Sequence, residues 1–333
     1  SYSNNSFSVA SQEASPSSLV FSTDGLNFYI CGYVNFTIYQ YSLSTPFDIT
    51  TASYSSKSFD PSAQGQYIQQ IQFDSSGLTM MLINSSNDAV YQYTLSTAWD
   101  ISTASYSSKS VSVSGQASRP QGLFFKPDGL AFYVVDDING SGFQYTLTTA
   151  WDLSTASYAS KSFSFTSQET GPQSVAIINS GSRLLIVGYQ NNTVYQYTLS
   201  TPWDISTASY DSSSFSVAPQ DNGYPTEITF SGDLQKMFMI GTASDAVFEY
   251  TLSSQLALGT GSFASADVGK TIEANSGVFV LTATDGSYVE TTAPTSYAQV
   301  ASGSWEMYGV VYNAADGDLE LSNYVKNAPV YNN

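Results

Sequence analysis

Short runs of alternating apolar and polar residues fill most of the chain. In Tyr-Gln-Tyr-Thr-Leu at 91–95, the two tyrosines and the leucine share one face, and the polar residues share the other. Turns such as Pro127-Asp128-Gly129 separate neighbouring runs, and glycine supplies the positive φ that tight hairpin turns need. This pattern predicts an all-β chain of short antiparallel strands.

The chain repeats itself with a step of 52 or 53 residues. The tyrosine that ends Tyr-Gln-Tyr, or its variants Phe-Gln-Tyr and Phe-Glu-Tyr, falls at positions 41, 93, 145, 197 and 250. Each unit holds four β-type runs, which in the third unit cover 122–126, 130–136, 142–147 and 156–165. Units of about 40–50 residues with four strands are typical of β-propeller blades.

The two ends of the repeat region complement each other. Residues 1–12 match the fourth run of a unit at 105–116, whereas the fifth unit has only its first three runs, at 226–252. Pairing 2–9 beside 246–252 gives five blades of four strands and covers two exposed edges. We therefore predict a five-bladed β-propeller over 1–254, closed by the N-terminal strand.

The repeat stops near residue 254, and 255–333 form a second unit with its own β-type runs. Asp-Gly pairs at 285–286 and 316–317 mark hairpin turns. Asp316, Asp318 and Glu320 do not have the spacing of an EF-hand, so we predict no metal site and no cofactor. The expected architecture is a small β-sandwich or barrel-like module.

Composition removes several classes of function. The formal charge of −18 opposes binding to nucleic acid or to an anionic membrane, and we find no apolar run long enough to span a bilayer. The chain has no histidine, which excludes Ser-His-Asp and Cys-His catalysis and histidine metal sites. Cys31 is the only cysteine, so no intrachain disulfide can form.

A Trp-Asp pair follows the third run in several units, and Phe47-Asp48 takes its place in the first. We interpret the aspartate as a cap that accepts backbone N–H bonds in a helical or Asx turn. The aromatic residue is expected to fill the space between neighbouring blades. Trp-Asp also occurs in WD40 repeats, but these use a Gly-His pair that this chain lacks.

One polar residue recurs at a strict step, between the fourth run of one unit and the first run of the next. The set is Gln12, Gln64, Gln116, Gln168 and Gln220. Five amides near the axis could bind sugar hydroxyls, because an amide both donates and accepts hydrogen bonds. The alternative, which we favour, is that each glutamine ties its loop to the backbone of the next blade.

Ligand specificity is expected where the repeats differ. Loops on the same face carry Tyr33, Asn84, Asp136, Asp137 and Tyr189, and beside the glutamines lie Glu13, Arg119, Glu169 and Asp221. Tyrosine rings with charged groups around a concave face suit carbohydrate recognition, through stacking and charge-assisted hydrogen bonds. The alternative for each residue is ordinary variation in a solvated loop.

Catalysis is the weaker interpretation. Some five-bladed propellers are glycoside hydrolases, which need two carboxylates about 5–9.5 Å apart. The innermost runs bring few carboxylates inward, and Asp136 with Glu169 or Glu13 would pair only by accident of the fold. We expect no enzymatic activity.

The string Tyr-Gln-Tyr-Thr-Leu-Ser-Thr-Ala-Trp-Asp-Ile-Ser-Thr-Ala-Ser-Tyr at 91–106 resembles repeats in tailed-phage structural proteins, many of them marine, and in some bacterial surface proteins. The resemblance covers roughly 1–254. Ala-Asp-Val-Gly-Lys-Thr-Ile at 266–272 is similar, more loosely, to small β modules of phage tail or decoration proteins. The resemblance implies a solvent-exposed virion component and transfers no catalytic residues.

Together these observations predict a non-enzymatic virion protein, in a tail fibre or a capsid decoration. Its propeller would attach to a host surface or glycan, and its C-terminal module would bind other virion proteins in a multi-copy assembly at the virion surface. The absence of disulfides suits assembly in a reducing cytoplasm. A bacterial adhesin or matrix protein is the alternative, and a propeller glycoside hydrolase is the second alternative.

Overall fold

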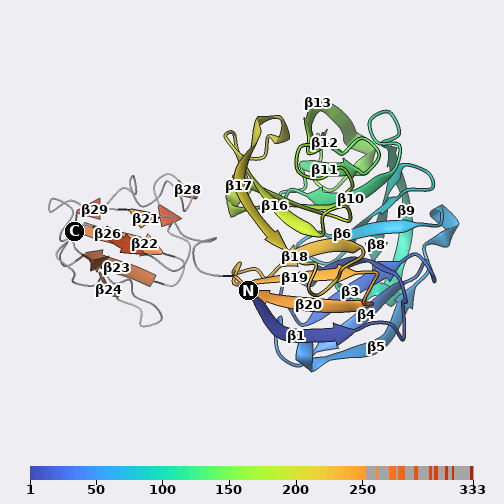
Figure 1. Ribbon diagram of the computed structural model, residues 1–333, viewed down its shortest axis with the longest axis horizontal. Helices are drawn as coiled ribbons and strands as arrows, with labels where there is room; N and C mark the ends of the chain where they lie inside the picture. Colours follow the sequence, from blue (N-terminus) through green and yellow to red (C-terminus); the bar gives the residue numbers. More distant parts are fainter. Residues whose placement is uncertain are drawn as a thin grey trace. The chain divides into compact units, whose positions relative to one another are not determined.

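Five four-stranded antiparallel sheets are arranged in a ring and form a β-propeller (Figure 1). The computed structural model describes residues 1–252 continuously and, beyond them, only the backbone of nine short strands. The innermost strands β2, β6, β10, β14 and β18 each neighbour the next around the ring, and β18 neighbours β2. The predicted all-β, five-bladed architecture is confirmed.

The blades have nearly the same strand lengths. Blade I holds β2 (Pro16–Phe21), β3 (Asn27–Gly32), β4 (Ile38–Leu43) and β5 (Ala52–Phe59). Blade II holds β6 (Ile68–Phe73), β7 (Thr79–Asn84), β8 (Ala89–Leu95) and β9 (Ala104–Ser112). Blade III holds β10 (Pro120–Phe125), β11 (Ala131–Asp136), β12 (Ser141–Leu147) and β13 (Ala156–Ser164). Blade IV holds β14 (Pro172–Ile178), β15 (Arg183–Gly188), β16 (Thr193–Leu199) and β17 (Ala208–Ser216). Blade V holds β18 (Pro225–Phe230), β19 (Lys236–Gly241), β20 (Ala246–Thr251) and β1 (Tyr2–Ser8).

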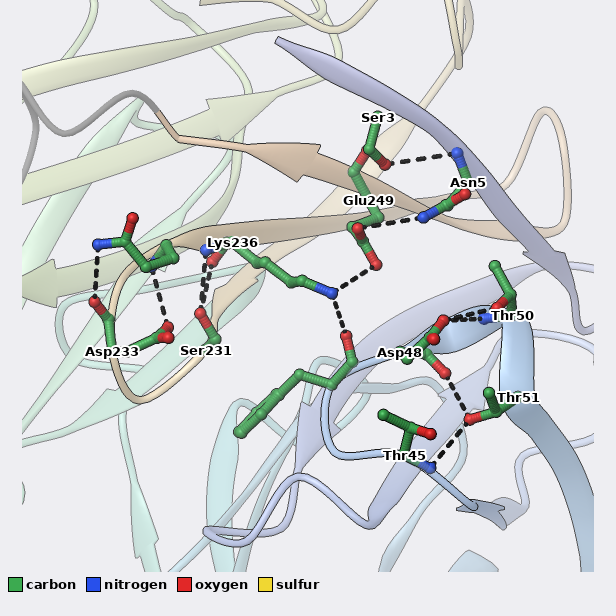
Figure 2. A network of polar contacts seen from close by, with 12 residues as sticks. Ser3, Asn5, Thr45, Asp48, Thr50, Thr51, Ser231, Asp233, Lys236 and Glu249 are labelled. Carbon is green, nitrogen blue, oxygen red and sulfur yellow. Dashed lines mark hydrogen bonds and ion pairs between the residues drawn. The ribbon is translucent and has the colours of Figure 1, made fainter. Parts of the chain in front are cut away.

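Strand β1 closes the ring by pairing with β20, as predicted. Phe7 lies opposite Val247 and Ser8 opposite Ala246 in an antiparallel register. Figure 2 shows the polar contacts at this seam, where Asn5 donates to Glu249 Oε1 at 3.2 Å. Lys236 Nζ bridges Glu249 of blade V and the carbonyl oxygen of Phe47 in blade I. Hydrogen bonds therefore fasten the closing strand in addition to the ladder.

The hydrophobic core lies between adjacent blades. In one cluster, Tyr29 and Cys31 of blade I pack with Ile71 and Leu82 of blade II, all nearly fully buried. This follows from the alternation in sequence, because each blade presents one apolar face to each neighbour. Stability therefore depends on contacts between consecutive blades, as in other repeat proteins.

The Trp-Asp turns have the two roles predicted for them. Each aspartate caps a one-turn 3₁₀ helix by accepting the N–H of the second residue after it, in η1 (Ile49–Thr51), η3 (Ile101–Thr103), η4 (Leu153–Thr155) and η6 (Ile205–Thr207). The aromatic residue reaches the preceding blade, as when Trp203 stacks on Phe124 at 6.5 Å. Two further 3₁₀ turns are η2 (Ser62–Gln64) and η5 (Asn179–Gly181).

The chain divides into two compact units, Tyr2–Gly232 with Lys236–Tyr250, and Ser1 with Asp233–Gln235 and Thr251–Asn333. The later strands are β21 (Thr260–Gly261), β22 (Lys270–Ala274), β23 (Gly277–Leu281), β24 (Val289–Thr291), β25 (Val300–Ala301), β26 (Ser304–Glu306), β27 (Tyr312–Asn313), β28 (Gly317–Asp318) and β29 (Tyr331–Asn332). The sandwich or barrel expected over 255–333 otherwise lies outside the described residues. Within the described part of the chain, no helix is long and apolar enough to cross a membrane.

Candidate functional site

The five repeated glutamines hold tyrosine hydroxyls. Each Oε1 accepts a hydrogen bond of 2.8–3.2 Å from the tyrosine that ends the repeated string on a third strand. The pairs are Gln12–Tyr41, Gln64–Tyr93, Gln116–Tyr145, Gln168–Tyr197 and Gln220–Tyr250. Each glutamine thus ties its loop to a side chain of the following blade, whereas the interpretation that we favoured named the backbone.

Every blade has a buried acceptor between two loops, on the face where the chain enters the first strand and leaves the second. In blades I, III, IV and V it accepts backbone N–H groups from both loops, whereas in blade II Asn84 accepts only from Ser86 of its own loop. In blades I, IV and V this acceptor directly follows the repeated glutamine, as Glu13, Glu169 and Asp221. Glu169 accepts the N–H groups of Gly171 at 2.8 Å and Asn191 at 3.2 Å. These carboxylates have at most 1% exposure and satisfy backbone donors.

Blades II and III draw the same acceptor from a different position. There the residue after the glutamine is Gly65 or Ala117, and the last residue of the second strand is Asn84 or Asp136. Asp136 accepts the N–H groups of Ser118 at 2.9 Å and Ile138 at 2.8 Å. Both acceptors are fully buried.

Glycine makes this exchange possible. Where the acidic residue follows the glutamine, the second strand ends in Gly32, Gly188 or Gly241, and a β-carbon there would overlap the acidic side chain. One buried acceptor per blade is therefore supplied from one of two positions, never from both. Asn84, Asp136, Glu13 and Glu169 consequently serve the loops, and we leave them out of the proposed ligand site.

The same face carries five pairs of residues that differ between blades, which we call the rim. Each pair joins the residue before the innermost strand to the residue after the second strand. The pairs are Ser15/Tyr33, Tyr67/Ser85, Arg119/Asp137, Gly171/Tyr189 and Tyr224/Thr242. In four of them the backbone N–H of the second residue donates to the carbonyl oxygen of the first, at 3.0–3.3 Å. Four blades thus present one tyrosine beside a small residue, and blade III presents an ion pair.

Hydrogen bonds link the rim to the start of the innermost strands. The Tyr33 hydroxyl donates to Gln69 Oε1 at 2.6 Å, and Gln69 Nε2 donates to Ser85 Oγ at 2.5 Å. In blade III, Arg119 Nε binds Asp137 Oδ1 at 2.6 Å, and Gln173 Nε2 lies 3.4 Å from Asp137 Oδ2. Tyr33 and Asp137 are therefore each held in position by a glutamine of the next blade.

The remaining tyrosines of blades IV and V stack on each other. The rings of Tyr189 and Tyr224 are 4.6 Å apart and nearly parallel, at 8°. Tyr189 lies over Gly171, where a β-carbon would overlap its ring. Both tyrosines are half-buried, whereas the Arg119 side chain beside them is 45% exposed.

The protonation of the rim follows from burial. Burial raises the pKa of Tyr33 well above its ordinary value and that of Tyr224 to about 12, with the carboxylate of Asp137 adding to both effects. Burial also raises the pKa of Asp137, and Arg119 opposes this rise. At neutral pH the two tyrosine hydroxyls are therefore uncharged and retain their protons as donors.

Glu227, which the sequence analysis did not single out, is a fully buried carboxyl on innermost strand β18. It accepts the backbone N–H of Leu19 in blade I, and its burial raises its pKa to about 8. Ser18 and Gln70, at the same position in blades I and II, likewise accept N–H groups of the next blade, from Ile71 at 3.1 Å and Leu123 at 2.6 Å. Glu227 thus belongs to a set of contacts that fastens the innermost strands.

Of the candidate residues, the structure gathers Tyr33, Arg119, Asp137 and Tyr189 on the rim. Sequence reasoning missed Tyr67 and Tyr224, which lie directly before innermost strands. An alignment of the five repeats would have shown that the position before each innermost strand varies, although the adjacent positions of the repeat are nearly identical.

No family model matches the chain, and no curated protein matches it. Among solved structures it is similar to a functionally unknown protein from Desulfotomaculum acetoxidans, at 13% identity over 71% of this chain and 82% of that chain, with a TM-score of 0.44. It is also similar to candidate 6-phosphogluconolactonases from Bacteroides fragilis (11% identity, 72% of this chain, 67% of that chain, TM-score 0.46) and Bacteroides uniformis (10%, 92%, 85%, 0.45). At this level of likeness the comparisons carry no argument about function.

Proposed function

We propose that the propeller is a non-enzymatic glycan-binding domain whose ligand site is the rim. The observation that carries the proposal is a contrast among the five blades of this chain, between positions that hold the same residue in each blade and positions that differ. Glutamines, capping aspartates and core tyrosines repeat, and their side chains bind other parts of the fold. The rim residues vary around one face, and four of the five pairs supply a tyrosine.

The rim chemistry suits a sugar. Half-buried tyrosine rings offer faces for stacking on the apolar side of a pyranose. The hydroxyl groups of Tyr189 and Tyr224 and the exposed end of Arg119 offer donors, whereas the Tyr33 hydroxyl donates its proton to Gln69. Asp137 orients the guanidinium of Arg119. Since Gln69 and Gln173 hold rim side chains in place, little conformational entropy would be lost on binding.

A glycan array with the full chain tests this proposal. The wild-type chain is expected to bind a restricted set of glycans, and a Tyr33→Ala/Tyr189→Ala double variant is expected to lose that binding. Tyr54→Ala is the matched control, because Tyr54 is a partly exposed tyrosine on β5 outside the rim. Binding that survives in the double variant, or no glycan binding by a folded wild-type chain, refutes the proposal.

We place this domain on a phage particle, in a tail fibre or a capsid decoration, with the C-terminal module contacting other virion proteins. The support is the resemblance of the repeat at 91–106 to repeats of tailed-phage structural proteins. An antibody against the chain should label particles in electron micrographs. Label on bacterial cells instead would favour the adhesin, and release of reducing sugar from a bound glycan would favour the hydrolase.

A further inference from the structure

One rim residue, Tyr67, and one residue beside the rim, Phe36, have backbone conformations that their aromatic side chains disfavour. Phe36, in the turn between β3 and β4, has φ 51°, and Tyr67, before β6, has φ 61°. Large side chains rarely adopt a positive φ, which costs of the order of 1–2 kcal/mol for each residue. Such strain persists where it serves a function.

At these two positions the strain is particular to the seam between blades I and II, whereas the positive φ of Phe47, Trp99, Trp151 and Trp203 recurs from blade to blade in the Trp-Asp turns. At the position of Phe36 the other blades have Asp88, Gly140, Asn192 and Asp245, which are residue types that tolerate a positive φ. At the position of Tyr67 the other blades have Ser15, Arg119, Gly171 and Tyr224, none of which has a positive φ. The fold therefore does not require an aromatic residue at either position.

Tyr67 and Val34 form an exposed apolar surface, and Phe36 beside them is half-buried and packs on the core between blades I and II. The rings of Phe36 and Tyr67 meet edge to face at 5.4 Å, Tyr67 is 49% exposed, and neighbouring Val34 is 56% exposed. We call Val34, Phe36 and Tyr67 the outer platform. Burial compensates little of the strain on Tyr67, so a purely structural role does not account for this residue.

The outer platform continues the rim. Tyr67 is itself a rim residue, and Gln69, two positions later, accepts the Tyr33 hydroxyl. The stacked pair Tyr189/Tyr224 lies elsewhere on the same rim, between blades IV and V. Aromatic surfaces at two separate seams can contact two different sugar units of one chain.

Charge indicates which sugars suit this face. Its buried carboxyl groups belong to Glu13, Asp136, Asp137, Glu169 and Asp221. Among residues 1–252, Arg119 is the one cationic side chain of the rim and its loops, and its Nε is bound to Asp137. The field at the rim is therefore negative, which disfavours an acidic glycan.

We infer that the ligand is a neutral oligosaccharide of several units, with one sugar held at the rim and a further sugar stacked on the outer platform. This inference rests on the proposed function and adds the length and charge class of the ligand. Stacking of one more sugar on exposed aromatic rings should tighten binding about tenfold.

Titration calorimetry with a length series tests the inference. The probes are glucose, galactose and mannose with their homo-oligomers of up to six units, and matched uronic acid oligomers. For the wild-type chain we expect about tenfold tighter binding of the long neutral oligomers than of the single sugar. Tyr67→Asn and Phe36→Asn should each abolish this gain with length. Tyr67→Asn should also leave the unfolding midpoint unchanged or raised, because asparagine tolerates a positive φ.

The outcomes separate this inference from the proposed function. Leu130→Asn is the control, since Leu130 is 41% exposed in a turn on the opposite face, and it should keep the full gain with length. If the wild-type chain binds single sugars as tightly as long ones, or if Tyr67→Asn keeps the gain, the inference is wrong and the proposed function stands. Preference for uronic acid oligomers would also overturn it. If no probe and no array glycan binds, both proposals fail.

Discussion

Exchanging the buried acceptor of blade IV for that of blade III tests the assignment of these residues to loop fastening. Glu169→Ala removes the carboxylate that accepts the N–H groups of Gly171 and Asn191. A buried donor left without a partner costs about 1–3 kcal/mol, so this variant should lose about 3 kcal/mol of unfolding free energy. Gly188→Asp should cost a similar amount, because its β-carbon overlaps Glu169 and places two carboxylates in one buried space.

The double variant Glu169→Ala/Gly188→Asp recreates the arrangement of blade III, where Ala117 stands with Asp136. Its new aspartate should accept the N–H groups of Thr170 and Gln190, the counterparts of Ser118 and Ile138, and so fasten the same two loops through adjacent amides. We therefore expect the double variant to cost only about 1 kcal/mol, against about 6 kcal/mol if the two changes were additive. The coupling of about −5 kcal/mol is large because both changes act on one buried site.

Urea unfolding of the full chain measures these free energies. Tryptophan fluorescence is a suitable probe because Trp99, Trp151 and Trp203 lie in the propeller. Thr170→Ala is the matched control, since Thr170 is an exposed neighbour of Glu169, and its effect should stay within about 0.5 kcal/mol. A double variant as unstable as the sum of the single variants would refute the exchange.

Three further predictions concern other parts of the propeller. Burial raises the pKa of Glu227 from 4.5 to about 8, so between these pH values the folded chain keeps a proton that the unfolded chain releases, and stability should fall as the pH rises. Glu227→Gln should flatten this fall in urea midpoints measured across that range. Wild-type and variant midpoints that fall in parallel with pH would contradict the prediction. Gly129→Ala should cost more than about 2 kcal/mol, because φ is +72° and the β-carbon would overlap Trp151, whereas Gly115→Ala, with open space around it, should change the thermal midpoint little. Lys109→Met should change the urea midpoint little at both low and high salt, because the ion pair with Asp152 is exposed to solvent and screened. A large drop at low salt that disappears at high salt would show that this interblade contact is a main source of stability.

The repeat allowed the architecture to be predicted from sequence in some detail. Five copies of one pattern gave the blade number, and the match between 1–12 and 105–116 gave the closure that β1 and β20 make. The roles of Trp203 and Asp204 were also accessible, because a recurring aromatic residue and a recurring turn cap have few structural uses. Regularity in sequence carries over to the fold because each blade packs only on its neighbours.

The candidate site was less predictable, because its residues meet only in three dimensions. The sequence showed that Glu169 and Asp136 lie in loops on one face, but not that each fastens backbone amides. It also placed the glutamines near the axis, whereas each is bound to a tyrosine of a third strand. The sequence did carry one unused signal. Between blades, the buried acceptor moves from the position after the repeated glutamine to the end of the second strand, where the other blades have glycine.

The closing strand gives this chain an unusual order of events during synthesis. Ser8 pairs with Ala246, so β1 leaves the ribosome 238 residues (246 − 8) before its partner. At about 5–20 residues per second, the strand waits of the order of 10–50 s. During that interval blades I to IV form, and β1 resembles the outer strand of each of them. None of these blades has a vacancy for β1, because each supplies its own outer strand. The pairing of β1 with β20 in blade V thus converts an open arc into a closed ring. Any delay in this pairing leaves two sheet edges available to neighbouring chains.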